Sequence, residues 1–160
     1  MIFVTVGMHH QGFNRLIKSM DELANQISEP VIMQIGASTY EPVHAKWFRF
    51  DTQERVEEIC AAARVIVGHA GAGTIISAFH CGRPIVVVPR LFRFREVVDD
   101  HQIELAQALS AQNKAVMVDE PTAQGLLDGI NKATNLPSTN SHGTRLAKAI
   151  HETLENNGSR

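Results

Sequence analysis

Short apolar runs alternate along the chain with longer segments in which apolar residues recur every three or four positions. The runs predict six strands, at residues 2–6, 31–35, 47–50, 65–67, 85–88 and 115–118. The periodic segments predict helices, at residues 13–27, 54–63, 74–81, 103–109, 126–130 and 146–154. Such alternation is typical of a parallel sheet with helices on both faces. The sequence therefore predicts one doubly wound α/β domain with a mostly parallel sheet over residues 1–155, and a frayed tail at 156–160.

Turn and cap residues set some of these boundaries. Pro30 ends the first predicted helix. Asp51 stands three residues before Glu54, which predicts a capping box at the start of the second helix. The polar stretch 135–143 is the only segment that resembles a linker.

Composition narrows the class of protein. The 160 residues are 44% hydrophobic and 20% charged, as is ordinary for a globular domain. With 15 Lys and Arg against 17 Asp and Glu, the formal net charge is −2, which excludes a broad nucleic-acid-binding face. The longest aliphatic run, 85–88, is far shorter than the roughly 18 residues of a membrane span, so we expect no span. Cys60 and Cys81 are expected to be free thiols in a reducing cytosol.

The clearest chemical signal is a glycine-rich turn between a predicted strand and a predicted helix. Residues 65–76 read Val-Ile-Val-Gly-His-Ala-Gly-Ala-Gly-Thr-Ile-Ile. Glycines at a helix start let backbone N–H groups approach an anion at the positive end of the helix dipole, which favours a phosphate site. The alternative is that Gly71 and Gly73 only allow close packing. The chain has neither a P-loop motif nor Gly-x-Gly-x-x-Gly after its first strand, which disfavours a P-loop hydrolase or a dehydrogenase.

A second polar segment, 89–102, follows the next strand and should lie at the same sheet edge. Its three arginines, of which Arg90 is the first, can partly neutralise a diphosphate. Its Asp-Asp-His-Gln run offers short polar groups to sugar hydroxyls. The alternatives are a solvated or partner-facing loop for the arginines and a helix N-cap role for Asp100.

Histidines cluster at the predicted strand ends. His9 and His10 follow the first strand and are candidates for proton transfer or acceptor contact. His69 and His101 occupy the two loops described above. No histidine or cysteine pattern has the spacing of a metal site, so we expect no metal.

Several motifs occur together in the order of a known family. They are Phe-Val-Thr-Val-Gly at 3–7, Phe-Asn-Arg-Leu-Ile at 13–17, Gly-His-Ala-Gly-Ala-Gly-Thr at 68–74, Gly-Arg-Pro at 82–84, Val-Pro-Arg at 88–90 and Asp-His-Gln-Ile-Glu at 100–104. With them the sequence resembles the C-terminal, donor-binding half of GT-B glycosyltransferases of family 28 over residues 1–120. It is most similar to small subunits of two-component enzymes: the eukaryotic pair that extends dolichol-linked oligosaccharide, and bacterial pairs that make capsule or exopolysaccharide. Ser-Thr-Tyr-Glu-Pro at 38–42 and the arginine-rich loop are shared with the bacterial branch.

The resemblance implies roles for individual residues. The donor diphosphate would be bound by the turn and the first arginine, that is by His69, Gly71, Ala72, Gly73, Thr74 and Arg90. The donor sugar would face Asp100, His101, Gln102 and Glu104. Ser77 departs from the family, because the eukaryotic branch and full-length relatives have a glutamate there that is interpreted as a ribose ligand. Glu104 or a residue of a partner would then make that contact.

The resemblance also implies a function. It is inverting transfer of a sugar, most plausibly galactose, from a UDP-sugar to a lipid-linked saccharide in capsule or exopolysaccharide synthesis. His10 or His9 would be the base, and no cofactor is implied beyond the UDP-sugar donor. The acceptor would be bound by a membrane-anchored partner subunit that holds this chain on the cytoplasmic face of the plasma membrane, with helix 146–154 as one candidate docking element. The alternative is a non-catalytic enhancer subunit of a glycosyltransferase complex.

Overall fold

The computed structural model describes residues 1–137, and its centre is a parallel sheet of six strands in the order β3-β2-β1-β4-β5-β6. The strands are β1 (Ile2–Thr5), β2 (Val31–Gln34), β3 (Lys46–Phe48), β4 (Val65–His69), β5 (Ile85–Val88) and β6 (Val116–Met117). Every neighbouring pair is parallel. The predicted doubly wound α/β fold is therefore confirmed.

The strand order reverses between β1 and β4, which are neighbours in register from Ile2 opposite Val65 to Thr5 opposite Gly68. In an open parallel sheet the loops that leave such a switch point diverge to opposite faces and leave a crevice at the carboxyl ends of the strands. Because β4 and β5 are also parallel neighbours, the loops after both strands emerge at this same edge, as predicted.

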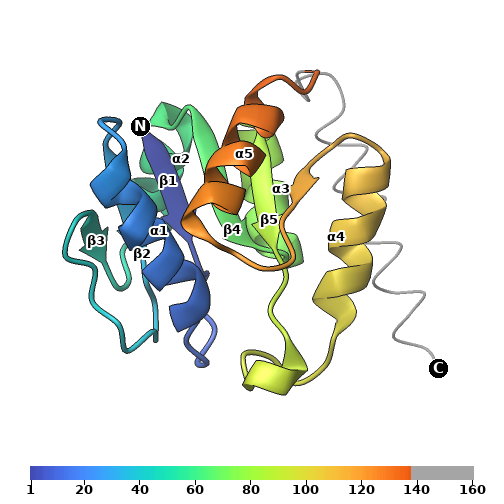
Figure 1. Ribbon diagram of the computed structural model, residues 1–160, viewed down its shortest axis with the longest axis horizontal. Coiled ribbons are helices and arrows are strands. Elements are labelled where there is room, and N and C mark those ends of the chain that lie inside the picture. Colours follow the sequence, from blue (N-terminus) through green and yellow to red (C-terminus); the bar gives the residue numbers. More distant parts are fainter. Residues whose placement is uncertain (138–160) are drawn as a thin grey trace.

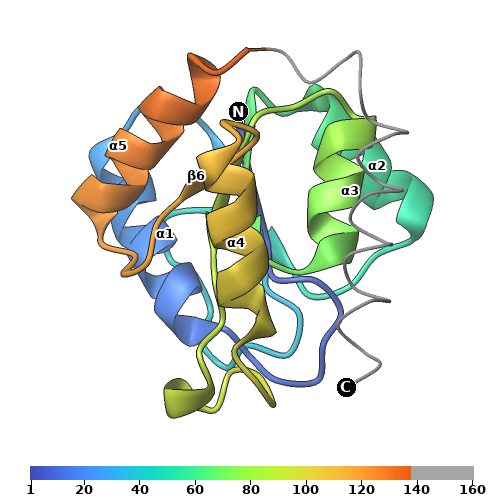
Figure 2. The same cartoon turned by 90° about the vertical axis from the view of Figure 1, so that its right-hand side faces the viewer.

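Helices cover both faces of the sheet. They are α1 (Asn14–Gln26), α2 (Gln53–Ala62), α3 (Ala72–His80), α4 (His101–Ala111) and α5 (Ala123–Thr134), with a short 3-10 turn η1 (Phe92–Phe94) between β5 and α4. Figure 1 shows α1 and α5 in front of the sheet, and the turned view of Figure 2 places them opposite α2 and α3.

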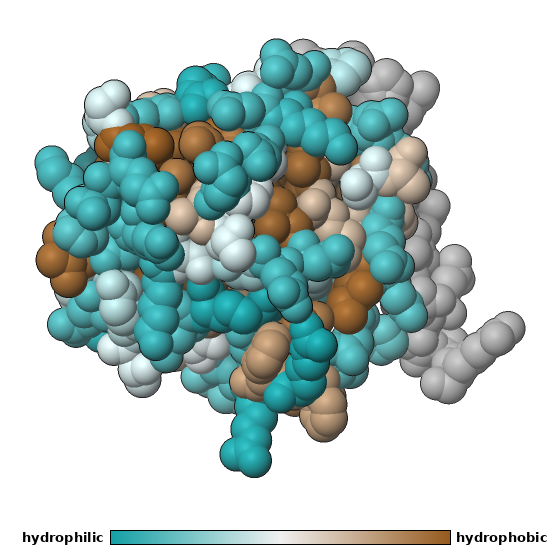
Figure 3. Space-filling view, in the orientation of Figure 1, coloured by the Kyte–Doolittle hydropathy of each residue, from teal (hydrophilic) through white to brown (hydrophobic). Residues whose placement is uncertain are grey.

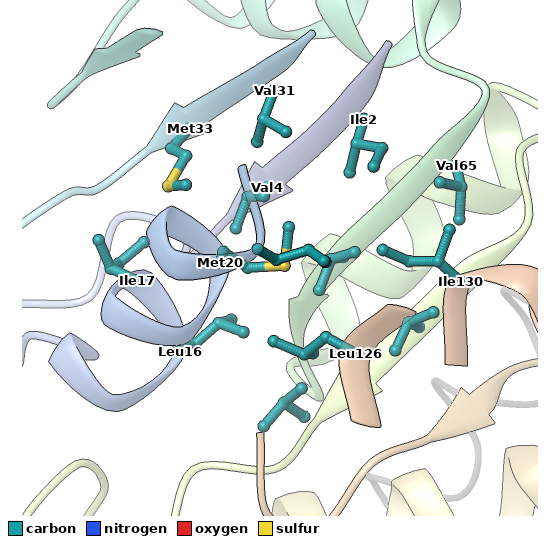
Figure 4. Packing of buried hydrophobic residues seen from close by; sticks show 14 of the residues in the cluster. Ile2, Val4, Leu16, Ile17, Met20, Val31, Met33, Val65, Leu126 and Ile130 are labelled. Carbon is teal, nitrogen blue, oxygen red and sulfur yellow. The ribbon is translucent and has the colours of Figure 1, made fainter. Parts of the chain in front are cut away.

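Each face has its own apolar core. Between the sheet and the α1–α5 layer, Val4, Met20, Met33, Leu126 and Ile130 are fully buried and converge from β1, β2, α1 and α5 (Figure 4). The other core lies under α2, α3 and α4. Alternation of side chains along β4 explains the division, since Val65 and Val67 belong to the first core and Ile66 to the second.

Some local predictions need correction. Helix α2 is capped by Thr52, whose side chain accepts a hydrogen bond from the Arg55 amide, whereas Asp51 accepts from the Thr52 amide. The predicted capping box of Asp51 and Glu54 is therefore wrong, because the N-cap of the helix is Thr52, one residue after Asp51. The helix predicted at 146–154 and the tail at 156–160 lie outside the described residues.

Candidate functional site

The glycine-rich turn joins β4 to α3 at the carboxyl edge of the sheet. Gly71 is the N-cap of α3 and has an extended backbone, and no side chain caps the helix. The first amides of an α-helix have no partner within the helix, so an uncapped start leaves donors for an external acceptor. Together with the helix dipole, these donors favour an anion at this position.

Gly7 and Gly71 border the His69 ring, whereas Gly73 does not. A Cβ on Gly71 would lie 2.1 Å from the His69 ring, and a Cβ on Gly7 would lie 2.7 Å from the same ring. Gly7 also has a left-handed φ of +70°. A Cβ on Gly73 would meet nothing within 4 Å. Packing therefore explains Gly71, but it does not explain Gly73, which borders open space.

His69 connects the strand end to the helix start. Its Nε2 lies 2.9 Å from the hydroxyl oxygen of Thr74, in a hydrogen bond within the turn. Burial and the charge of Arg90 lower the pKa of His69 to about 4, and the Gln102 side chain acts in the opposite direction. His69 is therefore neutral near pH 7, and it orients the Thr74 hydroxyl without adding charge to the site.

The lowered pKa predicts a pH dependence of stability. Between the unfolded pKa of 6.5 and the folded value of about 4, the unfolded chain binds the proton and the native chain does not. The free energy of unfolding should therefore fall by about 2 kcal/mol from pH 7 to pH 4.5 through this one group. Urea denaturation at both pH values should show that His69→Gln loses this part of the change. An equal pH dependence in the variant would contradict the assignment.

A cavity of about 410 Å³ opens beside the turn. Its base is formed by the carboxyl ends of the central strands, through Phe3, Thr5, Gln34 and His69. One side is a single face of α2, formed by Gln53, Val56, Glu57 and Cys60. The other side is α3, which presents Gly73, Thr74 and Ser77. Its volume is in the range of ligand pockets, roughly 300–1,000 Å³.

Arg90 does not line this cavity, and its predicted role as a direct diphosphate ligand stays a prediction. The side chain is 1% exposed, and its guanidinium donates to the backbone carbonyls of Val6, Gln11, Gly12 and Glu96 at 2.8–3.0 Å. Burial lowers its pKa to about 10, although the Glu96 charge acts in the opposite direction, so Arg90 stays a cation at neutral pH. Through these hydrogen bonds Arg90 links the loop after β1 to the loop after β5.

The predicted sugar-binding residues are not gathered at one point. Asp100 accepts a hydrogen bond from the Phe92 amide and lines a separate hollow of about 370 Å³. It occupies the N-cap position of α4, but its side chain does not cap the helix; Asp99 accepts from the His101 amide instead. Gln102 turns inward, and its Oε1 accepts from the Arg90 amide.

Two further predicted residues stay at the surface of α4. The exposed His101 ring lies 3.8 Å from a carboxylate oxygen of Glu104. Neither residue lines the cavity beside the glycine-rich turn. Glu104 therefore lies outside the cavity that Ser77 lines.

His9 and His10 are exposed on the loop after β1 and stack on each other with ring centroids 4.4 Å apart. Nδ1 of His9 accepts a hydrogen bond from the Gln11 amide, so the proton of the neutral ring is on Nε2. Burial lowers the pKa of His9, as do the charges of His10 and Arg90. Within the described part of the chain, no hydrogen bond engages the ring of His10.

Comparison with known proteins identifies the family and the fold. The sequence model of the family described as "Glycosyltransferase family 28 C-terminal domain" matches residues 1–157. The chain belongs to this family. The glycine-rich turn, the adjoining cavity and the loop after β5 all lie within the matched residues.

Individual relatives of the chain are also named as sugar transferases. The chain is 30% identical over 119 residues to the human UDP-N-acetylglucosamine transferase subunit ALG13, a match that covers 68% of this chain and 10% of the relative. It is 31% identical over 97 residues to a pyrophosphoryl-undecaprenol N-acetylglucosamine transferase of Sorangium cellulosum, covering 59% of this chain and 23% of that protein. The chain thus spans a quarter or less of the length of these relatives.

Solved structures share the fold. The glycotransferase of kitacinnamycin superposes with a TM-score of 0.67 at 19% identity, over 94% of this chain and 39% of that structure. Acinetobacter baumannii MurG superposes with a TM-score of 0.60 at 19% identity, over 94% of this chain and 49% of that structure. The fold of this family 28 domain is therefore that of one half of a GT-B glycosyltransferase.

Residues 1–137 contain neither a grouped set of metal ligands nor a membrane-spanning helix. No group of three or more His, Cys, Asp and Glu side chains is arranged there to hold a metal ion. None of the helices in the same range is long and apolar enough to cross a membrane.

The sequence alone did not indicate that α2 lines the cavity of the candidate site. Gln53, Val56, Glu57 and Cys60 recur at helical spacing, but the same spacing is expected for any amphipathic helix. The available signal was the mixture of acidic and apolar side chains on one face, which differs from a purely apolar core stripe.

Proposed function

We propose that the chain is the donor-binding, catalytic subunit of a two-component inverting glycosyltransferase that uses a UDP-sugar. The observation that carries this proposal is the open space in front of Gly73, at an uncapped helix start beside a cavity of ligand size. A glycine that no protein contact requires is explained by a ligand that approaches the backbone closely. Membership of family 28 supports a UDP-sugar as that ligand.

The proposed chemistry is a single displacement at the anomeric carbon of the donor sugar. The acceptor hydroxyl oxygen forms the new bond to this carbon as the bond to the diphosphate oxygen breaks, and UDP leaves with the electron pair. The start of α3 and the Thr74 hydroxyl stabilise the charge that develops on the leaving diphosphate. His10 takes the proton of the acceptor hydroxyl.

A partner subunit is proposed to bind the acceptor. Large apolar side chains are exposed on the loops at the carboxyl edge, namely Met8, Phe92, Phe94 and Val98. In Figure 3 light-brown surface lies beside strongly hydrophilic surface at the lower edge, where the loop with η1 protrudes in Figure 1. Exposed apolar groups of this kind mark interaction surfaces. The human relative is itself named as a transferase subunit.

The finer assignment rests on the bacterial branch of the resemblance. We propose galactose as the donor sugar, a polyprenyl-linked saccharide as the acceptor, and capsule or exopolysaccharide as the product. The partner would be membrane-anchored and would hold the chain on the cytoplasmic face of the plasma membrane. The relatives named above use N-acetylglucosamine, so UDP-N-acetylglucosamine is the competing donor.

A second candidate function is a non-catalytic enhancer subunit. Ser77 favours it, because this serine lines the cavity where family resemblance leads us to expect a ribose-binding glutamate. Under this alternative the chain would stabilise its partner without binding a donor.

Removing the proposed base separates transfer from binding. His10→Ala should abolish incorporation of labelled galactose from UDP-galactose into lipid-linked saccharide, a loss of about 100-fold or more. The affinity for UDP should stay within about twofold, since the His10 ring makes no contact in the turn. The measurement uses membranes of cells that express the chain with its partner, and calorimetry of the purified chain.

The matched control is His44→Ala, which removes an exposed histidine from the loop between β2 and β3. It should transfer galactose like the wild type. Retained turnover in His10→Ala would sink the assignment of the base. Label that enters lipid from UDP-N-acetylglucosamine but not from UDP-galactose would overturn the choice of sugar.

A further inference from the structure

The turn at the start of α3 accounts for the diphosphate of the proposed donor, but not for the cavity that continues beyond it. This cavity runs from Gly73 and Thr74 between α2 and α3. Its walls are partly apolar, through Phe3, Val56 and Cys60, as a stacked or packed ring requires. A ligand held by its diphosphate at the turn would place its neighbouring group here.

One acidic side chain of the cavity is placed to bind hydroxyl groups. Glu57 lies on the face of α2 that is turned toward α3, one helical turn before Cys60. The Cys60 thiol contacts the Ser77 carbonyl oxygen at 3.8 Å, which fixes the approach of the two helices at this level. Glu57 and Ser77 thus come from facing helices and line the same cavity.

The local hydrogen bonds leave Glu57 acceptor capacity. Its Oε1 accepts a hydrogen bond from the Gln53 side chain at 2.7 Å, which orients the carboxylate within the cavity wall. A carboxylate has about four acceptor sites, so most of its capacity is available. Two vicinal hydroxyls, as in a ribose, are donors that match a carboxylate in a two-point contact.

The other acidic candidates fit less well. Asp51 also lines the cavity, but its Oδ1 accepts from the Thr52 amide at 2.8 Å and belongs to the start of α2. Glu104 lies on α4 beside His101 and outside the cavity. Glu57 is therefore the carboxylate that the geometry selects.

We propose that Glu57 of α2 binds the ribose hydroxyls of the nucleoside diphosphate. This inference rests on the proposed function, because it takes the diphosphate to lie at Gly73. It assigns to a side chain of α2 the contact that Ser77 of α3 is too short and uncharged to make.

The test measures affinity by calorimetry, with UDP and 2′-deoxy-UDP as probes. Glu57→Ala should weaken UDP binding by about 10- to 100-fold, as expected for hydrogen bonds to a charged group. The preference of the wild type for UDP over 2′-deoxy-UDP should fall to about onefold in the variant. Glu57 is exposed, so the variant should fold like the wild type.

Two further variants sharpen the result. Glu58→Ala removes the next carboxylate of α2, which pairs with Arg55 and does not line the cavity, and it should bind UDP like the wild type. Glu57→Ala combined with Ser77→Glu supplies a carboxylate from the facing helix. This double variant should regain at least about tenfold of the lost affinity.

The outcomes separate this inference from the proposed function. A wild type that binds UDP, with unchanged affinity and unchanged ribose preference in Glu57→Ala, would overturn the assignment of Glu57 alone. The same holds if the variant loses affinity for a UDP-sugar but none for UDP, because Glu57 would then face the sugar. A wild type that binds no UDP would overturn the proposed function and this assignment with it.

Discussion

Gly73→Asp should lower the affinity for UDP by about 100-fold or more while the protein stays folded. The new carboxylate would extend into the space where nothing lies within 4 Å of a Cβ, beside the uncapped start of α3. There it would repel a diphosphate and occupy its position. Calorimetric titration with UDP measures the loss.

The same substitution should affect stability in the opposite direction. An acidic residue in the first turn of a helix interacts favourably with the helix dipole, by about 0.3–1 kcal/mol. Thermal denaturation should therefore show a melting temperature equal to or above that of the wild type. Gly73→Ala is the matched control; it should stabilise the helix by up to about 1 kcal/mol, and its methyl group should lower the UDP affinity by less than the carboxylate does. A Gly73→Asp variant that binds UDP like the wild type would remove the diphosphate from this turn.

Arg90→Met should destabilise the protein by about 3–5 kcal/mol, the largest loss of stability that we expect from a single substitution. Four backbone carbonyls would lose their donor. The ion pair between Arg15 and Glu96 would remain. The stacking of the Arg90 guanidinium over Phe13, 4.9 Å from the ring centroid, would also be lost. Denaturation by urea measures the change in the free energy of unfolding.

Two further variants serve as comparisons for Arg90→Met. Arg90→Lys should also be destabilising, because a single ammonium cannot serve four carbonyls that a planar guanidinium reaches together. Arg93→Met should change stability by less than about 0.5 kcal/mol, since Arg93 is exposed and pairs with Glu120 at 3.5 Å. If Arg90→Met kept its stability and lost only UDP affinity, Arg90 would be a diphosphate ligand, as the sequence alone predicted.

The parts of the fold that follow from local patterns could be predicted from the sequence. The strand at 85–88 has the predicted bounds, because four aliphatic β-formers between Pro84 and Pro89 allow little else. The start of α3 could not be predicted as well, since Ala72 and Gly73 extend the helix upstream of Thr74.

Buried polar residues could not be predicted from the local pattern either. Asp21 is a buried polar residue on the otherwise apolar face of α1. Its carboxylate accepts hydrogen bonds from the Tyr40 hydroxyl and from the amides of Val43 and His44, all in the loop between β2 and β3.

The candidate site could likewise be predicted only in part from the sequence. The glycine-rich turn is a local feature, and its place at the strand end follows from the βαβ pattern. The role of Arg90 depends on carbonyls up to 84 residues away in sequence, which no local pattern encodes. The role proposed for Glu57 likewise depends on the packing of α2 against α3, which brings Cys60 to the Ser77 carbonyl.

The most direct test of the account is calorimetric titration of the wild-type chain with UDP, with ADP as the control. A UDP-sugar donor site predicts saturable UDP binding, and ADP binding that is weaker by about tenfold or more, because the cavity beside Gly73 should select the nucleoside as well as the diphosphate. Equal binding of the two nucleotides, or no binding of UDP, would contradict a UDP-sugar donor site in this domain.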